Sequence, residues 1–225
     1  MNHPQAVALK ADFDRDGVVV IRDFVTPQTA RKICARAEAA TRDLPTRHDP
    51  FSNVTKGLEK LDEYFGELLH RGPQVAVLET LLGKKPEPTT ASFFTKDENR
   101  QEVHPHSDAM NGVVTWIALD ETTERNGCLQ FLKGSHKRQE EFRHLRAHTP
   151  TDLSDHPDRF EATMSPGDIV IFRPTTVHWS GPNHDGSARR GFNCFYVGNP
   201  FQGWKKDGMK DWRARKKAKL AAMAK

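Results

Sequence analysis

Two histidines and an aspartate occur within five residues in the segment HPHSDAM, which begins at His104. Residues two apart in a β-strand point to the same face, so the side chains of His104, His106 and Asp108 could all point inward. Imidazole nitrogens and carboxylate oxygens are common metal ligands. The segment therefore indicates a metal site, for which two pairs compete: His104 with His106, and His106 with Asp108.

The first pair is similar to the His-x-His motif of cupins, which normally has a glutamate a few residues later. Met110 and Asn111 occupy the corresponding positions here, which weakens the cupin interpretation. The second pair needs one distant histidine to give two histidines and one carboxylate on one face of an octahedron. Such a facial triad leaves positions open, which suits a non-haem Fe(II) that must also bind a cosubstrate and O2.

His178 is well placed to be the distant ligand, because it follows PGDIVIFRPTTV, a β-rich segment introduced by a turn. An alternative ligand set of His104, His106 and His178 would suit a zinc hydrolase or a cupin-like isomerase. The other histidines lack convergent partners in the sequence and are expected to be ordinary surface or core residues. They are His3, His48, His70, His136, His144, His148, His156 and His184.

Arg189 follows His178 by eleven residues, across a segment rich in glycine, proline, asparagine and aspartate. This composition predicts a hairpin that would lay Arg189 beside His178 on the partner strand. The planar fork of an arginine binds a carboxylate end-on. An iron centre with an arginine at that distance indicates 2-oxoglutarate, whose C1 carboxylate and keto oxygen would chelate the metal while the far carboxylate meets Arg189.

The elements that must position these residues fall into two parts. The first part, residues 1–87, is predicted to be mostly helical with one strand at GVVVIRDF, and Thr26 with Pro27 suits the start of a helix. Three apolar stripes at helical spacing predict buried helix faces. The stripes are Ala30, Ile33, Cys34 and Ala37; then Leu58, Leu61, Phe65 and Leu68; then Leu78, Leu81 and Leu82, which Gly83 ends.

The second part, residues 88–198, consists of short β-rich pieces separated by turn signals. Many short strands without intervening helices indicate an all-β sandwich or barrel. Lys133–Arg159 is polar and weakly patterned, and we interpret it as a long insertion of the kind that often forms a lid. The predicted strands are TTASFF, GVVTWIAL, CLQFL, FEATM, DIVIF and GFNCFYV.

Composition and charge narrow the function classes. The chain has 225 residues, of which 36% are hydrophobic and 28% charged, and we predict one domain over 1–203. The basic tail, 204–225, carries nine lysines and arginines against two aspartates, while the remainder has a net charge of −3. We interpret the tail as a solvated helix and expect no nucleic-acid binding, because no aromatic residue is interleaved from Arg213 onward.

Neither a membrane-spanning apolar run nor a signal-peptide pattern is present in the sequence. The three cysteines, Cys34, Cys128 and Cys194, are few and odd in number. This usage suits a reducing environment. We therefore expect a cytoplasmic protein that does not bind membranes.

Five segments, taken in order, resemble the phytanoyl-CoA dioxygenase family of Fe(II)/2-oxoglutarate oxygenases. They spread from Asp16 to Phe192 and read DGVVVIRDFVTP, HSD, VTWIALDETTERNGCLQFLKGSH, SPGDIVIFRPTTVHWSGPN and ARRGF. The resemblance implies a mainly β protein with flanking N-terminal helices and a double-stranded β-helix (jelly-roll, cupin-like) core. The chain departs from the family pattern at Lys133, where proline is usual, and at Ser107, where glutamine is common.

The same resemblance implies roles for individual residues. His106, Asp108 and His178 match the iron ligands. His104 is then a supporting residue, because a fourth protein ligand would block O2 or the cosubstrate.

On the cosubstrate side, Arg189 matches the residue that binds the far carboxylate of 2-oxoglutarate. Ser180, two residues after the distal histidine, would assist that arginine. Trp116 and Lys96 are similar to residues that line the family's cosubstrate pocket.

Arg189 has an adjacent competitor, Arg190, and only one of the two can point into the barrel. Strand alternation places Arg189 and Gly191 on one face, and Arg190, Phe192 and Cys194 on the other. The family spacing selects Arg189, and the small Gly191 would leave room for a bound acid. Phe192 and Cys194 can be buried on the outward face if helices cover it.

The activity that follows is hydroxylation of an unactivated C–H bond of a small-molecule substrate by an Fe(II)/2-oxoglutarate-dependent dioxygenase. O2 would be consumed, and 2-oxoglutarate would be decarboxylated to succinate and CO2. Asp108 favours hydroxylation, since related halogenases have a small residue in its place to admit a halide. Two alternatives stay open: another cupin-type metalloenzyme, either an isomerase or a hydrolase, and a non-catalytic binding descendant of the family.

Overall fold

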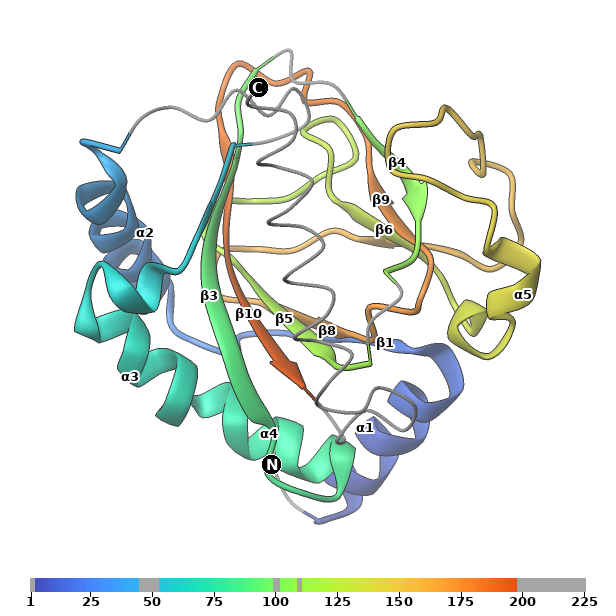
Figure 1. Ribbon diagram of the computed structural model, residues 1–225, viewed down its shortest axis with the longest axis horizontal. Helices are drawn as coiled ribbons and strands as arrows, with labels where there is room; N and C mark the ends of the chain where they lie inside the picture. The colour runs from blue at the N-terminus through green and yellow to red at the C-terminus, as the bar shows by residue number, and fades with distance from the viewer. Residues whose placement is uncertain (1–2, 45–52, 99–101, 109–110, 198–225) are drawn as a thin grey trace, which may run out of the picture.

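Two antiparallel sheets that face each other form the centre of the computed structural model (Figure 1), which describes residues 3–44, 53–98, 102–108 and 111–197. The larger sheet has the strand order β1 (Val18–Ile21), β8 (Ile169–Phe172), β5 (Val113–Ala118), β10 (Arg189–Val197), β3 (Glu87–Lys96) and β2 (Asn53–Lys56). The smaller sheet has the order β4 (Val103–His106), β9 (His178–Ser180), β6 (Leu129–Leu132) and β7 (Arg159–Ala162). All six β-rich pieces predicted in residues 88–198 contain a strand, and the mainly antiparallel jelly-roll core is confirmed.

The space between the sheets is filled by apolar side chains from both of them. This inner cluster consists of Val18, Val114, Trp116, Ala118, Phe131, Ala162, Met164, Val170 and Phe172. Because successive residues of a strand point to opposite faces, the alternate residues of the larger sheet point to its outer face.

Four helices cover the outer face of the larger sheet (Figure 1): α1 (His3–Asp16), α2 (Pro27–Thr41), α3 (Glu63–Arg71) and α4 (Pro73–Leu82). Their apolar faces pack on Phe93, Ile117, Ile171, Phe192 and Cys194 in a second cluster. Phe192 and Cys194 are 1% and 0% exposed, so the expected helix cover over the outward face of β10 is confirmed. Arg189 is three residues before Phe192 on the same strand, so strand alternation places it on the inward face of β10.

Capping residues set the ends of these helices. Thr26 caps α2, its Oγ1 accepting a hydrogen bond of 3.2 Å from the backbone N of Thr29, and Pro27 is the first helical residue, as predicted. Gly83, with φ 69°, ends α4 in the left-handed conformation.

The predicted stripe that begins at Leu58 is wrong as a single helix. A 3-10 turn, η1 (Leu58–Lys60), precedes α3, and Leu61 is 44% exposed. Asp62 begins α3 by accepting a 2.9 Å hydrogen bond from the backbone N of Tyr64. This cap restarts the helical period, which then buries Phe65 and Leu69.

Strands from the N-terminal part complete the larger sheet. β1 pairs with β8, with Val18 opposite Phe172, as the strand predicted at GVVVIRDF allows. β2 pairs with β3, with Val54 opposite Phe94, and was not predicted because four residues with mixed polarity give no clear alternation. The sheet is therefore not confined to residues 88–198.

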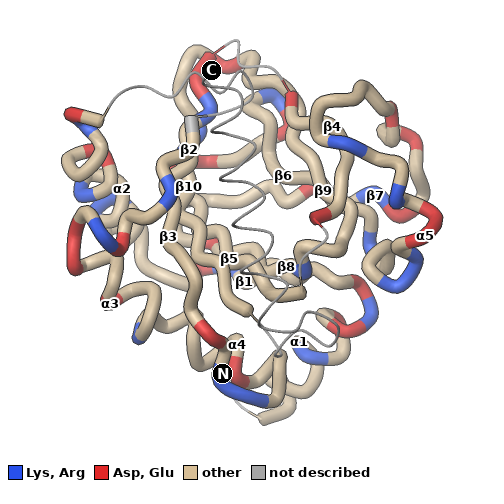
Figure 2. Tube along the Cα trace, in the orientation of Figure 1, with Lys and Arg blue, Asp and Glu red and all other residues tan. Residues whose placement is uncertain are grey.

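The polar insertion folds as short turns beside the smaller sheet. It contains η2 (Ser135–Lys137) and α5 (Gln139–Phe142). Figure 2 shows positively and negatively charged positions mixed around α5. None of the helices in the described part of the chain is long and apolar enough to cross a lipid bilayer. The predicted helical tail, 204–225, lies outside the described residues, and so does His48.

Candidate metal and cosubstrate site

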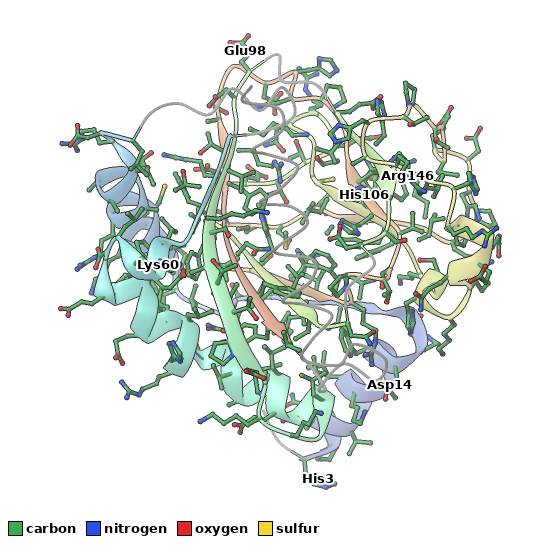
Figure 3. All side chains as sticks on the ribbon, viewed as in Figure 1. His3, Asp14, Lys60, Glu98, His106 and Arg146 are labelled. Carbon is green, nitrogen blue, oxygen red and sulfur yellow. The ribbon has the colours of Figure 1, made fainter. Side chains whose placement is uncertain are left out.

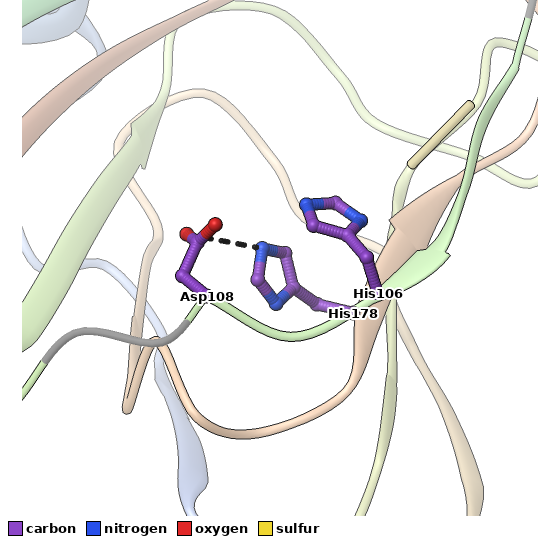
Figure 4. A group of neighbouring side chains, drawn as sticks. All are labelled: His106, Asp108 and His178. Atoms are coloured by element: carbon purple, nitrogen blue, oxygen red, sulfur yellow. Dashed lines mark ion pairs between the residues drawn. The ribbon is translucent and has the colours of Figure 1, made fainter. Parts of the chain in front are cut away.

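Neighbouring strands bring His106, Asp108 and His178 together. His106 ends β4 and is the register partner of His178, which begins β9, and the two ring centroids lie 4.4 Å apart. Asp108 Oδ2 lies 4.0 Å from His178 Nε2 (Figure 4). One ligand atom from each of the three residues lies within 4.8 Å of the other two. Among the described residues, no other group of three or more histidine, cysteine, aspartate or glutamate side chains has this arrangement.

Backbone carbonyls fix which nitrogen of each imidazole faces the site. His106 Nδ1 lies 2.8 Å from the carbonyl oxygen of His104, and His178 Nδ1 lies 2.8 Å from that of Thr176. A carbonyl oxygen accepts only, so each Nδ1 carries a hydrogen and Nε2 is the nitrogen left for a metal. A neutral imidazole held in this tautomer by its other nitrogen is the usual form of a metal ligand.

His178 is buried against aromatic side chains. It is 8% exposed, and its ring centroid lies 5.0 Å from that of Phe172 and 6.4 Å from that of Phe131. Burial, together with the nearby His106 ring, lowers the pKa of His178 below its usual value. The imidazole is therefore neutral at physiological pH, as coordination requires.

Asp108 reaches the site in a different way from the one predicted. β4 ends at His106, and its register with β9 shifts between Val103 and His106, so strand alternation does not extend to Asp108. Instead, the backbone N of Asp108 donates a 2.9 Å hydrogen bond to the carbonyl of Pro174, in the segment that leads to β9. The carboxylate is half exposed and is oriented by this loop contact.

His104 lies outside the three-residue group. Its Nδ1 pairs with Glu102 Oε1 at 2.9 Å, and its carbonyl holds the ring of His106. Its backbone N donates to the carbonyl of Ala147 in the insertion. The geometry thus gives His104 a supporting position, and the alternative set of three histidines does not converge.

The predicted hairpin between His178 and Arg189 is wrong. β9 belongs to the smaller sheet and β10 to the larger one, so the connection 181–188 crosses between the sheets. Buried Asn183 holds this crossing, since its Nδ2 donates to the carbonyls of Lys96 at 2.8 Å and Ser187 at 2.9 Å. A composition rich in turn residues is compatible with this loop, but it does not determine which sheet the next strand joins.

Arg189 points into the space between the sheets and is 4% exposed. Its Nε is buried without a hydrogen-bond partner, and no carboxylate of the described residues forms an ion pair with it. The guanidinium carbon lies 5.3 Å from the ring centroid of Trp116. Burial lowers the pKa of Arg189 to about 10, so it stays charged at neutral pH. A buried cation without an anion is costly, and this arrangement fits an anionic ligand.

Lys96 lies on β3, directly opposite Arg189 on β10, and is fully buried. Its Nζ donates to Ser180 Oγ at 2.7 Å, to the Ser180 carbonyl at 3.3 Å and to the Gly181 carbonyl at 2.6 Å. Burial and the nearby Arg189 charge lower the pKa of Lys96 to about 6. Ser180 therefore contacts Lys96, whereas the sequence predicted that it would assist Arg189.

Gly191 does not leave open room, contrary to expectation. A Cβ atom on Gly191 would lie 1.9 Å from Cζ2 of Trp116, because the indole lies flat against β10 at this point. The glycine thus allows Trp116 to reach the position beside Arg189. Arg190 faces the helices, where it forms hydrogen bonds of 2.7 and 2.8 Å with the carboxylate of Asp120 and also pairs with Glu38.

A cavity of about 540 Å³ opens beside His106 and Asp108 of the three-residue group. One wall consists of His106, Ser107 and Asp108, and the opposite wall is supplied by the insertion. The insertion residues are Gln139, Glu140, Arg143, Leu145, Arg146, Ala147 and His148. The insertion therefore borders the site, as a lid would. The sequence did not single out Arg143 or Arg146, because two arginines in a polar segment give no signal until the fold places them.

A sequence comparison agrees with this geometry. The model of the phytanoyl-CoA dioxygenase (PhyH) family matches residues 13–191. The chain is also 27% identical over 137 residues to the peroxisomal phytanoyl-CoA dioxygenase of Bos taurus, a match that covers 56% of this chain and 40% of that protein. The matched region thus spans less than half of that relative's length.

Solved structures share the fold. The carbocyclase SnoK from nogalamycin biosynthesis, described as non-heme and alpha ketoglutarate dependent, superposes with a TM-score of 0.70 at 18% identity, covering 84% of this chain and 83% of its own. The epimerase SnoN in complex with Fe3+, alpha ketoglutarate and nogalamycin RO gives 0.73 at 18% identity, covering 87% and 84%. At these identities the likeness concerns the jelly-roll fold. Because the family match extends over most of the residues, the chain belongs to the phytanoyl-CoA dioxygenase (PhyH) family.

Proposed function

We propose that this protein is an Fe(II)/2-oxoglutarate-dependent oxygenase in which His106, Asp108 and His178 bind the iron. Family membership and the fold of the solved neighbours support this class of enzyme. The observation that carries the proposal is the presence in one fold of a partly exposed His-Asp-His group and of a buried guanidinium whose Nε has no hydrogen-bond partner. A metal that leaves open positions and a cation that lacks an anion are what 2-oxoglutarate requires at its two ends.

Each end of the cosubstrate has its own residues. The two imidazoles present their Nε2 atoms, and the carboxylate of Asp108 completes a ligand set that suits Fe(II). Arg189 receives the far carboxylate, and Lys96 and Trp116 form the walls beside it. Bound iron supplies the activation of O2 that oxidises 2-oxoglutarate to succinate and CO2. Phe131 and Phe172 keep water away from the His178 side of the site.

Hydroxylation of an unactivated C–H bond is the reaction outcome that we propose. Asp108 supports it, because a carboxylate in that position leaves no place for a halide. The solved neighbours of this fold include a carbocyclase and an epimerase, so the fold is compatible with other outcomes of the same oxidation. Mass analysis of the product distinguishes a gain of one oxygen atom from a loss of two hydrogens or from no change in mass.

The substrate is proposed to be a small molecule, and the 540 Å³ cavity is in the range that binds drug-sized ligands. The cytoplasmic location also stays a proposal. It is supported by the three cysteines, which are all unpaired and buried.

The proposal is tested with protein loaded with Fe(II) under argon. Addition of 2-oxoglutarate should produce the charge-transfer absorption of the Fe(II) chelate, and admission of O2 should release succinate. Arg189→Ala should lose the absorption at 2-oxoglutarate concentrations that saturate the parent protein, whereas Arg190→Ala should keep it. Failure of the parent protein to form the absorption band would contradict the proposal and favour a metalloenzyme of another class.

A further inference from the structure

The insertion places one arginine above the metal site without a compensating acid. Arg146 and His106 line the same cavity, and Figure 3 shows their labelled side chains next to each other in this view. Arg146 is exposed, and no carboxylate of the described residues forms an ion pair with it. Arg143, which lines the same cavity, differs in that its Nη1 lies 3.3 Å from Glu140 Oε2. Of these two arginines, Arg146 is therefore the one whose positive charge is not compensated by an acid.

The guanidinium of Arg146 is oriented by backbone oxygens. Its Nη1 donates to the carbonyls of Arg143 at 2.6 Å and Leu145 at 2.7 Å. Both of these bonds use the same nitrogen, so the Nε–Nη2 edge remains available for a ligand. That edge has the geometry that binds a carboxylate or phosphate bidentately.

The backbone on either side of Arg146 is anchored to the walls of the site. Leu145 and Phe142 are 4% and 6% exposed and pack with Leu132, Val177 and Trp179, the last two of which flank His178. On the other side, the carbonyl of Ala147 accepts a 3.1 Å hydrogen bond from the backbone N of His104, in the ligand strand. Arg146 is thus held at a fixed place relative to His106, which a binding residue requires.

We infer that the substrate carries an acid group, a carboxylate or a phosphate, which Arg146 binds while the rest of the molecule extends toward His106 and Asp108. This inference rests on the proposed function and names the class of its substrate. The charges on the cavity wall support it, because Glu140 is paired with Arg143 and Asp108 is assigned to the metal. An anion bound at Arg146 would also place the reacting part of the substrate at a defined distance from the iron.

The inference is tested by calorimetric titration, under argon, of full-length protein loaded with Fe(II) and 2-oxoglutarate. The probes are pairs with the same skeleton: 3-phenylpropanoate and 3-phenylpropanamide, decanoate and decanamide, and phenyl phosphate and phenol. We expect the charged member of at least one pair to bind roughly tenfold more tightly than its neutral partner. Arg146→Gln should abolish that preference and leave binding of the neutral member unchanged.

Arg71→Gln is the matched control, since Arg71 is an exposed arginine on α3 that pairs with Glu67 away from the cavity. It should keep the full preference for the charged probes. The absence of any such preference in the parent protein, or its survival in Arg146→Gln, would overturn the inference. The charge-transfer band shows whether a negative result contradicts only the inference or also the proposed function. If the band forms and no preference is found, only the inference is wrong; if the band does not form, the proposed function fails and the inference with it.

Discussion

Lys96 and Arg189 lie directly opposite each other across the β3–β10 ladder, and both side chains are buried between the sheets. Burial and the charge of Arg189 both disfavour a second cation there, which lowers the pKa of Lys96 to about 6. No carboxylate of the described residues forms an ion pair with either of them. The pair is therefore suited to one carboxylate of a ligand, which would compensate the charge of Arg189 and favour the protonated form of Lys96.

Removing the charge of Arg189 should stabilise the unliganded protein. Arg189→Met replaces an unpartnered buried cation by an apolar side chain of similar length, and we expect a higher midpoint of thermal unfolding without ligand. The same variant should lose the stabilisation that 2-oxoglutarate gives the parent protein, since a broken buried charge pair costs about 2–5 kcal/mol. Differential scanning calorimetry with and without 2-oxoglutarate measures both effects.

Arg190→Met is the control for that experiment. Arg190 is paired with Asp120 and Glu38, so its removal should lower the unfolding midpoint and leave the response to 2-oxoglutarate unchanged. An equal loss of the ligand response in both variants would contradict the assignment of Arg189.

Binding of 2-oxoglutarate should take up a proton at Lys96. In the unliganded protein the pKa of Lys96 is about 6, so the amine is mostly neutral at pH 7.5. A bound dianion favours the ammonium form and raises this pKa, so that affinity falls as pH rises above about 6. Calorimetry in buffers with different ionisation enthalpies measures the uptake. Lys96→Met should remove it, and uptake that persists in this variant would place the proton elsewhere.

The lowered pKa of Lys96 also affects folding. The unfolded chain binds this proton up to its ordinary pKa of 10.5, whereas the folded protein releases it near pH 6. Between these values the unfolded state binds more protons, so Lys96 makes the unliganded protein more stable as pH rises. Denaturant unfolding across this window should show a shallower rise in Lys96→Met than in the parent protein.

Substitution of the three converging residues should reduce iron binding more than substitution of His104. His106→Ala, Asp108→Ala and His178→Ala should each prevent stable binding of Fe(II), because each removes one of three ligands. His104→Ala should retain most of the iron, since the contact that holds His106 uses the His104 backbone carbonyl. Metal content after gel filtration is the measurement. Loss of iron from His104→Ala equal to that from His106→Ala would show that the ligand set is wrong.

Gly191→Ala should disturb Trp116. The new methyl group would lie 1.9 Å from Cζ2 of the indole, which forces the ring away from Arg189. We expect a loss of stability of about 1–3 kcal/mol, typical of an overpacked core, together with weaker 2-oxoglutarate binding. Combining Gly191→Ala with Trp116→Leu should restore part of the stability, because the clashing ring is gone. If the double variant is no more stable than Gly191→Ala, the clash is not with Trp116.

The amino-acid sequence predicted most of the strands, though not β2, and it pointed to the chemistry-bearing residues. Short β-rich segments bounded by turn residues predicted all six β-rich pieces of the core, because composition and turn signals are local properties of the sequence. The types and spacing of the histidines and Asp108 indicated a metal site and left two ligand sets open, and the resemblance to the family selected His106, Asp108 and His178. The resemblance to the family added Lys96, Trp116 and Ser180, which composition and periodicity could not single out.

Contacts between distant segments of the chain determine which residues lie next to one another in the site. The sequence indicated a turn between His178 and Arg189, but only the packing of the two sheets places these residues on opposite layers, since a turn does not specify the partner of the strand that follows. Asp108 converges through a bond to Pro174 and not through strand alternation, and Gly191 accommodates Trp116 and not a ligand. Arg146 acquired its position over the metal site only when the insertion folded back onto the ligand strand. The sequence determines the residue types and their local periodicity. The partner that each side chain contacts depends on which distant segments pack together in the buried core.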